Sequence, residues 1–569
     1  MFHRVAADVR LPMTPVAAES PRQAAVLPLE LVLLVLLSVA GFVLRTWSFG
    51  DAALSHFDEG VYAFTGLGLS DATQPFRMFP EQQKFSPPVF IALVALFNSF
   101  GIDPARGPLV VNAVVGSVTI PVVWWISRRW FGPAAAVATA ALVALSEFHI
   151  LLSRSALTDA TFALTFLVAL AAMLSAIERL TWRAAVVAGI CVGLAWNTKY
   201  HGWFALVVGA MVIAGRWQLQ GAGNAWFGRA FRVWILASVV ALLCYLPWAL
   251  FIQTQPGSST GWASYFATML RLDWFGNFWR HVEQQHYIEG PWSRASVPLA
   301  LLAAQAVNAA TGRRLAPWWV APAAAAGALV LGSSGTAAAL SLWILAKRWR
   351  AGMRGPDWLL AGVIVLWVVM APIYHPYFRL LMPFALATYA LAGIALASSD
   401  DGVPTRVPAT LVAAAVATVM TAMITRVLPD PSDPWRPLPG LARAADALHS
   451  ILPPGVPVRV MGEPSLAFHL HRRGHQAFKR TYIDSLDDGT EPVYLVTGIY
   501  LRRSPEPRVK FNQRRDRMEP LARIPLGAPS DLRILDDFTP DSARRWRQHP
   551  DTTYDLLLFR YRPQGATRR

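Results

Sequence analysis

Charged residues and cysteines are scarce in this chain. Only 15% of its 569 residues are charged, and its two cysteines, Cys191 and Cys244, both lie inside apolar runs. A soluble protein carries about 25% charged residues, so this composition excludes an ordinary soluble fold. Because the polar segments have no cysteine, a disulfide framework and a cysteine-based metal site are excluded as well.

Apolar residues take the place of the missing charge. The chain is 54% hydrophobic and contains 23 tryptophans, which predicts an integral membrane protein. The net charge of +16 does not indicate nucleic-acid binding, because Lys and Arg gather at the ends of apolar runs, as at Arg128-Arg129. In such places they meet anionic headgroups. We therefore expect membrane lipids, and no nucleic acid, as partners.

Apolar segments recur along the first three quarters of the chain. A bilayer core of about 30 Å needs roughly 20 apolar residues per helix. The segments are 27–47, 107–127, 132–150, 157–177, 184–198, 203–215, 232–253, 296–311, 317–332, 335–346, 357–373, 377–397 and 406–427. They predict an all-α polytopic membrane domain of about 11 to 13 transmembrane helices. The lower number applies if the segment Gly332–Gly335 lies inside one helix and 296–311 lies in the interface.

The distribution of Lys and Arg predicts the orientation and three regions. Residues 1–26 form a cytoplasmic tail, since no cleavage site follows the first apolar run, and residues 27–427 form the transmembrane domain. Its outer loops are 48–106 and 254–295, where interfacial helices are expected near 55–70 and 87–100. Residues 428–569 form a small α/β domain outside a bacterial-type plasma membrane.

The C-terminal region alternates strand and helix patterns after a proline-rich stretch. The expected strands and helices are Val458–Met461, Val493–Thr497, Tyr554–Tyr561, Leu441–Ile451 and Pro464–Arg472.

An acidic pair, Asp58 and Glu59, follows the first apolar segment. Adjacent carboxylates tend to raise the pKa of one of them, which suits proton abstraction from an acceptor hydroxyl or amine. A helix cap exposed to solvent is the alternative reading of this pair.

Several cations break the positive-inside rule because they lie on the predicted outer face. Arg154 and Asp159 lie five residues apart between apolar segments, as an ion pair or as part of a polar cleft. A lipid phosphate could be bound by a basic wall of outer residues, although each could instead anchor its own helix. The candidates for this wall are Lys84, Arg154, Lys199 with Tyr200, His375 with Tyr377, and Arg379.

The outer loop near residue 280 holds aromatic and histidine residues, which are typical of an interface belt. His281, Glu283 and His286 match no standard metal-binding spacing. We expect no metal site, and nothing in the sequence requires a cofactor.

The order of these motifs resembles the GT-C superfamily of polytopic glycosyltransferases, in particular the protein O-mannosyltransferases and the bacterial aminoarabinose transferases of lipid A. The matching stretches are FDEGVYAF, KFSPPVFIALVALFNSFG, RGPLVVNAVVGSVTIPVVWWISRRWFG, LSRSALTDATFALTF, GLAWNTKYHGWFAL, YLPWALFI and HPYFRLLMPFALATYALAGIALA. This chain departs from the family at Gly60, where members commonly have arginine or alanine, at the spacing after Lys84, and at His375.

The resemblance implies inverting transfer of a sugar from a polyprenyl-phosphate donor to a lipid, glycan or protein acceptor on the outer face. It assigns Asp58 as the general base, Glu59 as its companion and Asp159 as a second acid. Lys84, Lys199 and Arg379 correspond to positions that hold the lipid phosphate.

Two other function classes stay open. A transporter or flippase of lipid-linked sugars also needs intramembrane charges, although usually near the midplane and with internal repeats. The transmembrane helices could alternatively anchor a C-terminal domain that does the binding, with Glu463, His469, His471 and His475 as candidates.

Overall fold

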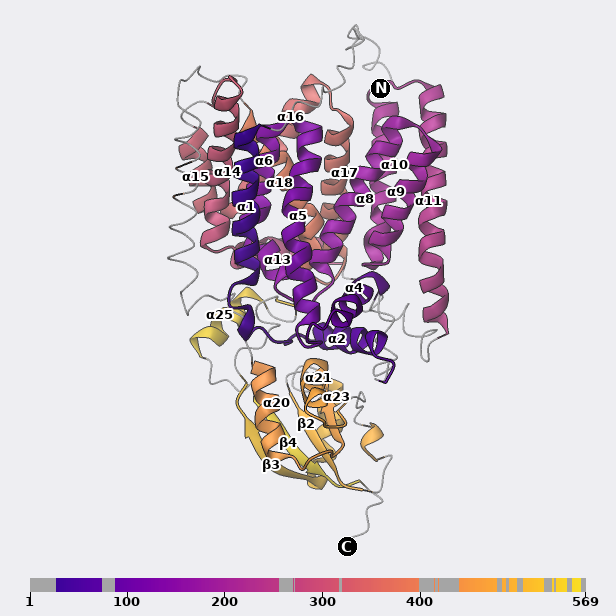
Figure 1. Cartoon of the computed structure of the whole chain (residues 1–569), viewed down its shortest axis with the longest axis vertical. Coiled ribbons are helices and arrows are strands. Elements are labelled where there is room, and N and C mark those ends of the chain that lie inside the picture. Colours follow the sequence, from indigo (N-terminus) through magenta and orange to yellow (C-terminus); the bar gives the residue numbers. More distant parts are fainter. Residues whose placement is uncertain are drawn as a thin grey trace.

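A helical bundle and a small α/β unit make up the computed structural model of the chain (Figure 1). The structure describes residues 27–73, 87–254, 270, 272–316, 320–398, 414, 418, 440–477, 484–487, 491–498, 505–526, 535–536, 539–549 and 555–563. Lys84 and nearly all of the predicted span 406–427 lie outside these residues.

Helices follow the apolar runs of the sequence. The first ten are α1 (Pro28–Thr46), α2 (Phe57–Ser70), α4 (Pro88–Ser99), α5 (Gly107–Phe131), α6 (Pro133–Leu145), α7 (Glu147–Ser153), α8 (Asp159–Arg179), α9 (Trp182–Trp196), α10 (Phe204–Gln218) and α11 (Asn224–Gln253). Then come α13 (Trp274–Ile288), α14 (Pro291–Ala310), α15 (Val320–Val330), α16 (Gly332–Ala351), α17 (Gly355–Met370) and α18 (Met382–Ala397). Short 3-10 turns are η1 (Phe49–Asp51), η2 (Tyr200–Trp203), η3 (Ala371–Ile373) and η4 (Phe378–Leu381).

The length of these helices tests the membrane prediction. Among the described residues, 6 helices are long and apolar enough to cross a membrane, and the bent pair of α6 and α7 raises the number to 7. A multi-pass, mainly helical membrane protein is therefore confirmed. The larger number of spans expected from the sequence stays a prediction.

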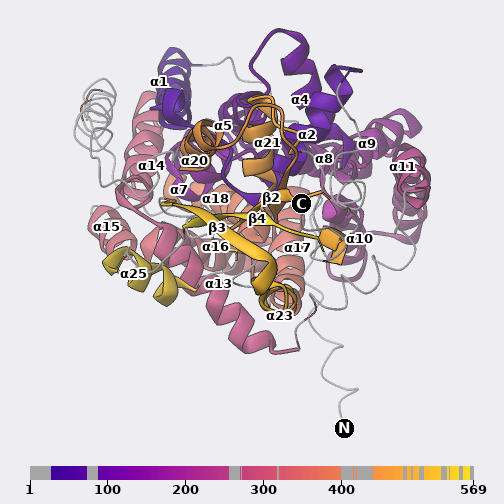
Figure 2. The ribbon, with the colours of Figure 1, turned by 90° about the horizontal axis from the view of Figure 1, so that it is seen from below.

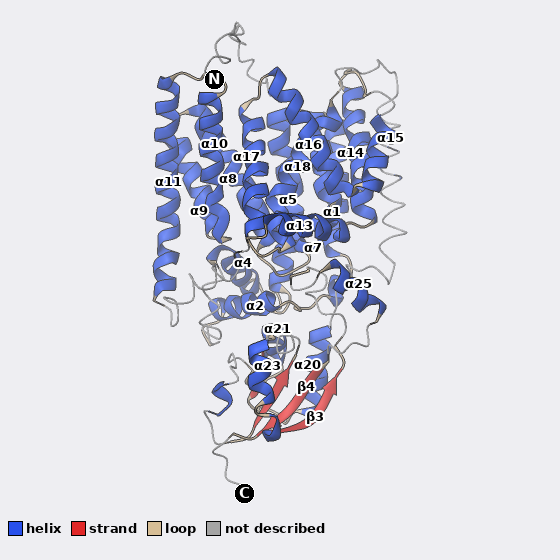
Figure 3. Ribbon diagram, turned by 180° about the vertical axis from the view of Figure 1, so that it is seen from behind, coloured by secondary structure: helices blue, strands red, loops and turns tan. Residues whose placement is uncertain are grey.

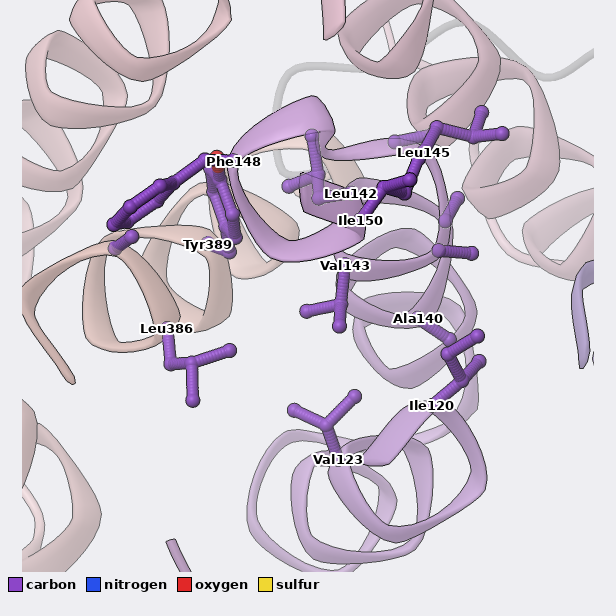
Figure 4. Close-up of a cluster of buried hydrophobic side chains, with 14 of the residues drawn as sticks. Ile120, Val123, Ala140, Leu142, Val143, Leu145, Phe148, Ile150, Leu386 and Tyr389 are labelled. Carbon is purple, nitrogen blue, oxygen red and sulfur yellow. The ribbon is translucent and has the colours of Figure 1, made fainter. Parts of the chain in front are cut away.

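The predicted span at 132–150 is not a single straight helix, because the chain bends by 59° between α6 and α7. At the bend, the hydroxyl of Ser146 accepts a hydrogen bond from His149 N (3.3 Å) and lies 3.0 Å from the hydroxyl of Tyr389. The next residue, Glu147, accepts hydrogen bonds from backbone N–H groups at the start of α14, including Ser293 N at 3.3 Å. Buried apolar side chains of α5, α6, α7 and α18 pack around this bend (Figure 4).

A turn at Gly332 separates α15 from α16, which decides between the two readings of the segment Gly332–Gly335. Gly332 has a φ of +74°, a conformation that favours glycine. Glu289 accepts hydrogen bonds from Ser333 N (2.6 Å) and Ser334 N (2.7 Å), so a carboxylate from the connection between α13 and α14 caps α16.

Three helices, α2, α4 and α13, lie across the end of the bundle nearest the α/β unit (Figure 3). The first two occupy the segments where interfacial helices were predicted. The third was predicted as part of a loop. Helix α13 buries a mostly polar side, which includes Asn277 and Gln284, and exposes the aromatic side chains of Phe275 and Trp279. Hydrogen bonds hold the buried side, for example from Gln284 Nε2 to Pro376 O (2.9 Å).

The C-terminal unit is a four-stranded sheet with helices. Its elements are α20 (Gly440–Ile451), β1 (Val458–Met461), α21 (Pro464–Arg472), η5 (Asp484–Asp487), β2 (Val493–Thr497), α23 (Pro505–Asn512), η6 (Arg515–Arg517), β3 (Met518–Ile524), α25 (Pro540–Gln548) and β4 (Leu556–Tyr561). The strand order is β1-β2-β4-β3, with β1 and β2 parallel and the other pairs antiparallel. Strand β3 was not predicted, because Pro520 and a register shift beside it interrupt the alternation of side chains.

The C-terminal unit packs directly on α2 (Figure 2). Phe64 of α2 meets Phe468 of α21 edge to face, with ring centroids 5.0 Å apart. Ser465 at the start of α21 donates a hydrogen bond to the carbonyl oxygen of His56 (2.5 Å). A Cβ added at Gly60 would lie 2.2 Å from Ser465 N, so this close approach requires glycine. The departure from the family pattern at Gly60 therefore has a structural cause.

Candidate active site

The N-terminus of α2 places the acidic pair. His56 is the N-cap residue, and its Nδ1 accepts a hydrogen bond from Asp58 N (3.1 Å). Glu59 accepts from Ser55 N (2.7 Å) and His56 N (2.9 Å) through one oxygen, and from Ala156 N (2.8 Å) through the other. With its carboxylate buried among backbone donors, Glu59 is a structural cap. The sequence offered base and cap as alternatives for this pair, and in the structure the contacts of the cap are made by Glu59 together with His56.

Asp58 faces the opposite way, toward the bundle. Its side chain is 30% exposed, and its Oδ2 lies 3.1 Å from Nη2 of Arg379 on η4. The structure thus joins residues from two distant motifs and leaves the Asp58 side chain partly exposed.

Asp159 is the second acid of the cluster. It is the first residue of α8, and its side chain is 1% exposed. It pairs with the ammonium of Lys199, which follows α9, and its Oδ2 lies 3.8 Å from Nη1 of Arg379. The sequence paired Asp159 with Arg154 as one alternative, whereas the structure pairs Asp159 with Lys199 and Arg379.

Asp536, a residue that the sequence did not single out, completes the cluster. Its Oδ2 lies 3.1 Å from Nη2 of Arg379 and 3.0 Å from Nε2 of His56. The only local signal is an acidic pair, Asp536-Asp537, next to an apolar residue. Such a pattern is usually a solvated turn, so the sequence could not show that it enters this site.

The electrostatics of the cluster correct one step of the sequence argument. Burial raises the pKa of the Asp58 carboxyl, but interactions with Arg379, His56 and Lys199 outweigh burial and hold this pKa below its usual range. The expected raising of the pKa by a neighbouring carboxylate is therefore wrong for Asp58. The carboxylate is ionised at neutral pH, as a general base must be.

The other predicted binding residues lie in different settings. Arg154 donates hydrogen bonds to the carbonyl oxygens of Leu44 (3.2 Å) and Trp47 (2.8 Å), and so holds the end of α1. The ring of Tyr377 lies beneath the guanidinium of Arg379 at 5.4 Å, and His375 meets Tyr377 edge to face at 4.5 Å. Tyr200 begins η2, next to Lys199.

Among the residues that the structure describes, no group of three or more His, Cys, Asp and Glu side chains is arranged to hold a metal ion.

A family model matches part of the chain. The family model described as dolichyl-phosphate-mannose-protein mannosyltransferase matches residues 97–256. No curated protein matches the chain significantly.

Solved structures match over most of the chain. The Archaeoglobus fulgidus oligosaccharyltransferase in complex with Zn and sulfate is similar at a TM-score of 0.51 and 16% identity, over 82% of this chain and 68% of that chain. The A. fulgidus oligosaccharyltransferase AglB in complex with an inhibitory peptide and a dolichol-phosphate is similar at a TM-score of 0.51 and 16% identity, over 83% and 70%. ArnT from Cupriavidus metallidurans bound to undecaprenyl phosphate aligns at a TM-score of 0.42 and 15% identity, over 95% and 99%.

The resemblance predicted from the sequence is thus confirmed at this level: over residues 97–256 the chain matches the model of the dolichyl-phosphate-mannose-protein mannosyltransferases, and its fold is similar to that of the A. fulgidus oligosaccharyltransferase.

Proposed function

We propose that this protein is a membrane glycosyltransferase that moves a sugar from a polyprenyl-phosphate donor to an acceptor on the outer face of the membrane. One observation carries the proposal: Oδ2 of Asp58, whose side chain is partly exposed, lies 3.1 Å from Nη2 of Arg379, beside the Asp159–Lys199 pair. The proposed base, Asp58, thus lies next to the cations Arg379 and Lys199. The family match and the dolichol-phosphate in the similar AglB complex support a lipid-linked donor.

The reaction follows from the charges in the cluster. Asp58 takes the proton of the acceptor hydroxyl or amine while the acceptor atom attacks the anomeric carbon. The bond between that carbon and the phosphate oxygen breaks, and its electron pair stays on the phosphate. Attack from the side opposite the phosphate inverts the anomeric centre. Arg379 and Lys199 stabilise the negative charge that accumulates on the leaving phosphate.

The remaining assignments belong to the same proposal. Glu59 positions Asp58 through the cap of α2, and Asp159 positions Lys199 and Arg379. Lys84, Arg154, Tyr200, His375 and Tyr377 stay predicted contacts of the donor or its lipid phosphate, and no metal or cofactor is assigned. The acceptor is a lipid, a glycan or a protein, and the transferred sugar is a hexose or a pentose.

The predicted orientation is part of the proposal too. The arginines at the end of α5 and the start of α17 lie together, since Arg354 donates a hydrogen bond to Trp130 O at 3.2 Å. This end of the bundle is away from the C-terminal sheet (Figure 1). The positive-inside rule then puts the N-terminus in the cytoplasm, and residues 428–569 with the site outside a bacterial-type plasma membrane. About 11 to 13 spans in residues 27–427 accord with this arrangement.

The position of the cluster favours a transferase over a transporter of lipid-linked sugars. Asp58 and Asp159 begin their helices, and Asp536 reaches them from the C-terminal region. The cluster therefore lies at the end of the bundle, whereas transporters bind their substrate near the midplane.

Replacement of Asp58 by asparagine tests the proposal. We expect the turnover of Asp58→Asn to fall by about 10² to 10⁴-fold, because the shape is kept but the proton acceptor is lost. The measurement is sugar transfer from a polyprenyl-phosphate donor in proteoliposomes. The matched control is Asp71→Asn, at the exposed end of the same helix, which should leave turnover unchanged. Undiminished turnover of Asp58→Asn would exclude this residue as the base.

A further inference from the structure

Asp536 reaches the site from the C-terminal region, and its immediate neighbours pack on the transmembrane part. Leu535 is 1% exposed and belongs to the apolar core of the bundle, together with Ala543 of α25. Nη2 of Arg544 on the same helix lies 3.8 Å from Oε1 of Glu283 on α13. These contacts hold Asp536 against the membrane domain independently of the pairing of Asp536 itself.

The carboxylate of Asp536 contacts two groups at once. Oδ2 lies 3.0 Å from Nε2 of His56 and 3.1 Å from Nη2 of Arg379, and the side chain is 6% exposed. The other oxygen, Oδ1, is buried without a hydrogen-bond partner among the described residues. A buried carboxylate is costly unless cations or hydrogen-bond donors compensate its charge. The carboxylate of Asp536 therefore keeps its two partners, His56 and Arg379, close to Oδ2.

The contact with His56 has a consequence for the imidazole. Nδ1 of His56 accepts a hydrogen bond from Asp58 N, so this nitrogen carries no proton. The proton of the neutral ring then lies on Nε2 and is donated to Asp536. Asp536 therefore favours the tautomer that the cap of α2 needs, and this cap fixes the backbone of Asp58.

The contact with Arg379 reaches Asp58 by a second route. Nη2 of Arg379 lies 3.1 Å from Oδ2 of Asp58 and also 3.1 Å from Oδ2 of Asp536. One nitrogen thus stands between the two carboxylates. A guanidinium held from both sides is oriented before a substrate binds, which reduces the reorganisation needed in the transition state.

We infer that Asp536 is a positioning residue of the transfer reaction: it holds His56 and Arg379 in the arrangement that Asp58 requires. The inference rests on the proposed function, and it makes the C-terminal region a part of the active site. Because Asp536 acts through two other residues, its removal should lower the rate of the chemical step more than the binding of the donor.

The test compares variants of the full-length protein in proteoliposomes, with kcat and the donor KM measured separately. Asp536→Asn keeps the size and removes the charge, and we expect kcat to fall about tenfold or more while KM stays within about threefold. Asp536→Glu keeps the charge and should restore kcat to within about threefold of the wild type. The matched control is Asp541→Asn, whose partner is the exposed Arg544, and its kcat should not change.

Each alternative has its own outcome. If Asp536 merely blocks the place of the donor phosphate, Asp536→Asn lowers the donor KM and raises turnover at low donor concentration, which overturns the inference. If Asp536 is only structural, the melting temperature falls while kcat per folded protein stays unchanged, which also overturns it.

Two further measurements distinguish a variant that fails to fold from a failure of the proposed function. Should Asp536→Asn fail to fold, Asp536→Glu decides: a kcat reduced tenfold or more at the wild-type melting temperature refutes the inference. Wild-type vesicles that transfer no sugar refute the proposed function and this inference with it. Wild-type turnover together with unchanged kinetics of Asp536→Asn refutes the inference alone.

Discussion

Arg379 is the residue on which the charges of the site converge. Three carboxylates surround its guanidinium: Asp58 and Asp536 at 3.1 Å, and Asp159 at 3.8 Å. Arginine suits this place, because its planar group presents five donors and keeps its charge when desolvated. Lysine has a single charged point and could not contact three carboxylates in the same geometry.

Replacement of Arg379 by glutamine should move the pH dependence of transfer. Arg379 is the largest influence that holds the pKa of Asp58 low, so without it burial raises this pKa. Since the base works only when ionised, the acid limb of the pH profile of kcat/KM should rise by about one to two pH units. The rate should fall at all pH values, because the leaving phosphate loses a donor.

The control for this profile is Arg106→Gln, a variant of an exposed arginine that donates to Gly50 O. An acid limb that stays in place in Arg379→Gln would mean that the titrating group is not Asp58.

The sequence identified those residues of the site that are unusual in their local surroundings. Asp58, Asp159, Lys199 and Arg379 are ionisable groups beside apolar runs, where burial is costly without a purpose. Asp536 lies in a polar stretch, where an acidic residue is common and gives no indication of a site. Its partner His56 precedes it by 480 residues, and no local pattern encodes such a contact.

At the scale of elements, α2 is held on two sides. Its N-terminus is capped by His56 and Glu59, and α21 of the C-terminal unit packs on its other face, where Gly60 meets Ser465. Burial also lowers the pKa of His469 on α21 to about 4, so its neutral ring donates to Leu54 O at neutral pH. The helix that carries Asp58 thus depends on contacts from both parts of the chain.

An alanine at position 60 should loosen this packing. Its Cβ would lie 2.2 Å from Ser465 N and 2.3 Å from the carbonyl carbon of Pro464, which are backbone atoms that cannot turn aside. We expect Gly60→Ala to destabilise the docked arrangement by about 1 to 3 kcal/mol, seen as a lower melting temperature. Gly50→Ala is the control, because no atom lies within 4 Å of its added Cβ. Equal melting temperatures of the two variants would contradict the close approach of α21.

Helix boundaries were predictable where the cause is local, and not where it is distant. The segments of α2 and α4 follow from apolar patterns and from Pro88 at the first helical position. The break after α6 depends on Glu147, whose partner Gly290 is 143 residues away. Apolar composition alone therefore predicted a continuous helix there.

At the scale of the whole molecule, the bundle and the C-terminal unit share an apolar core. Phe64 and Leu67 of α2 pack with Leu448, Leu466 and other residues of the C-terminal unit. The C-terminal unit is therefore packed as a continuation of the membrane part and not as a separate body.

A protease site introduced after residue 428 tests this union. After cleavage we expect the two pieces to stay together and to keep transferring sugar within about twofold of the uncut rate, because burial of apolar surface at the α2 interface holds them. The measurement is copurification of both pieces in detergent, followed by the transfer assay. Dissociation with retained activity of the membrane piece would show that the C-terminal unit, Asp536 included, is dispensable.

The late position of Asp536 in the chain has a consequence for biosynthesis. A ribosome that has made every helix of the bundle has not yet made the last constituent of the site, which comes after α18 and after β3. An unfinished chain in the translocon therefore holds an incompletely oriented base. Under the proposed function, sugar transfer therefore begins only when almost the whole polypeptide has been made and Asp536 has reached His56 at the start of α2.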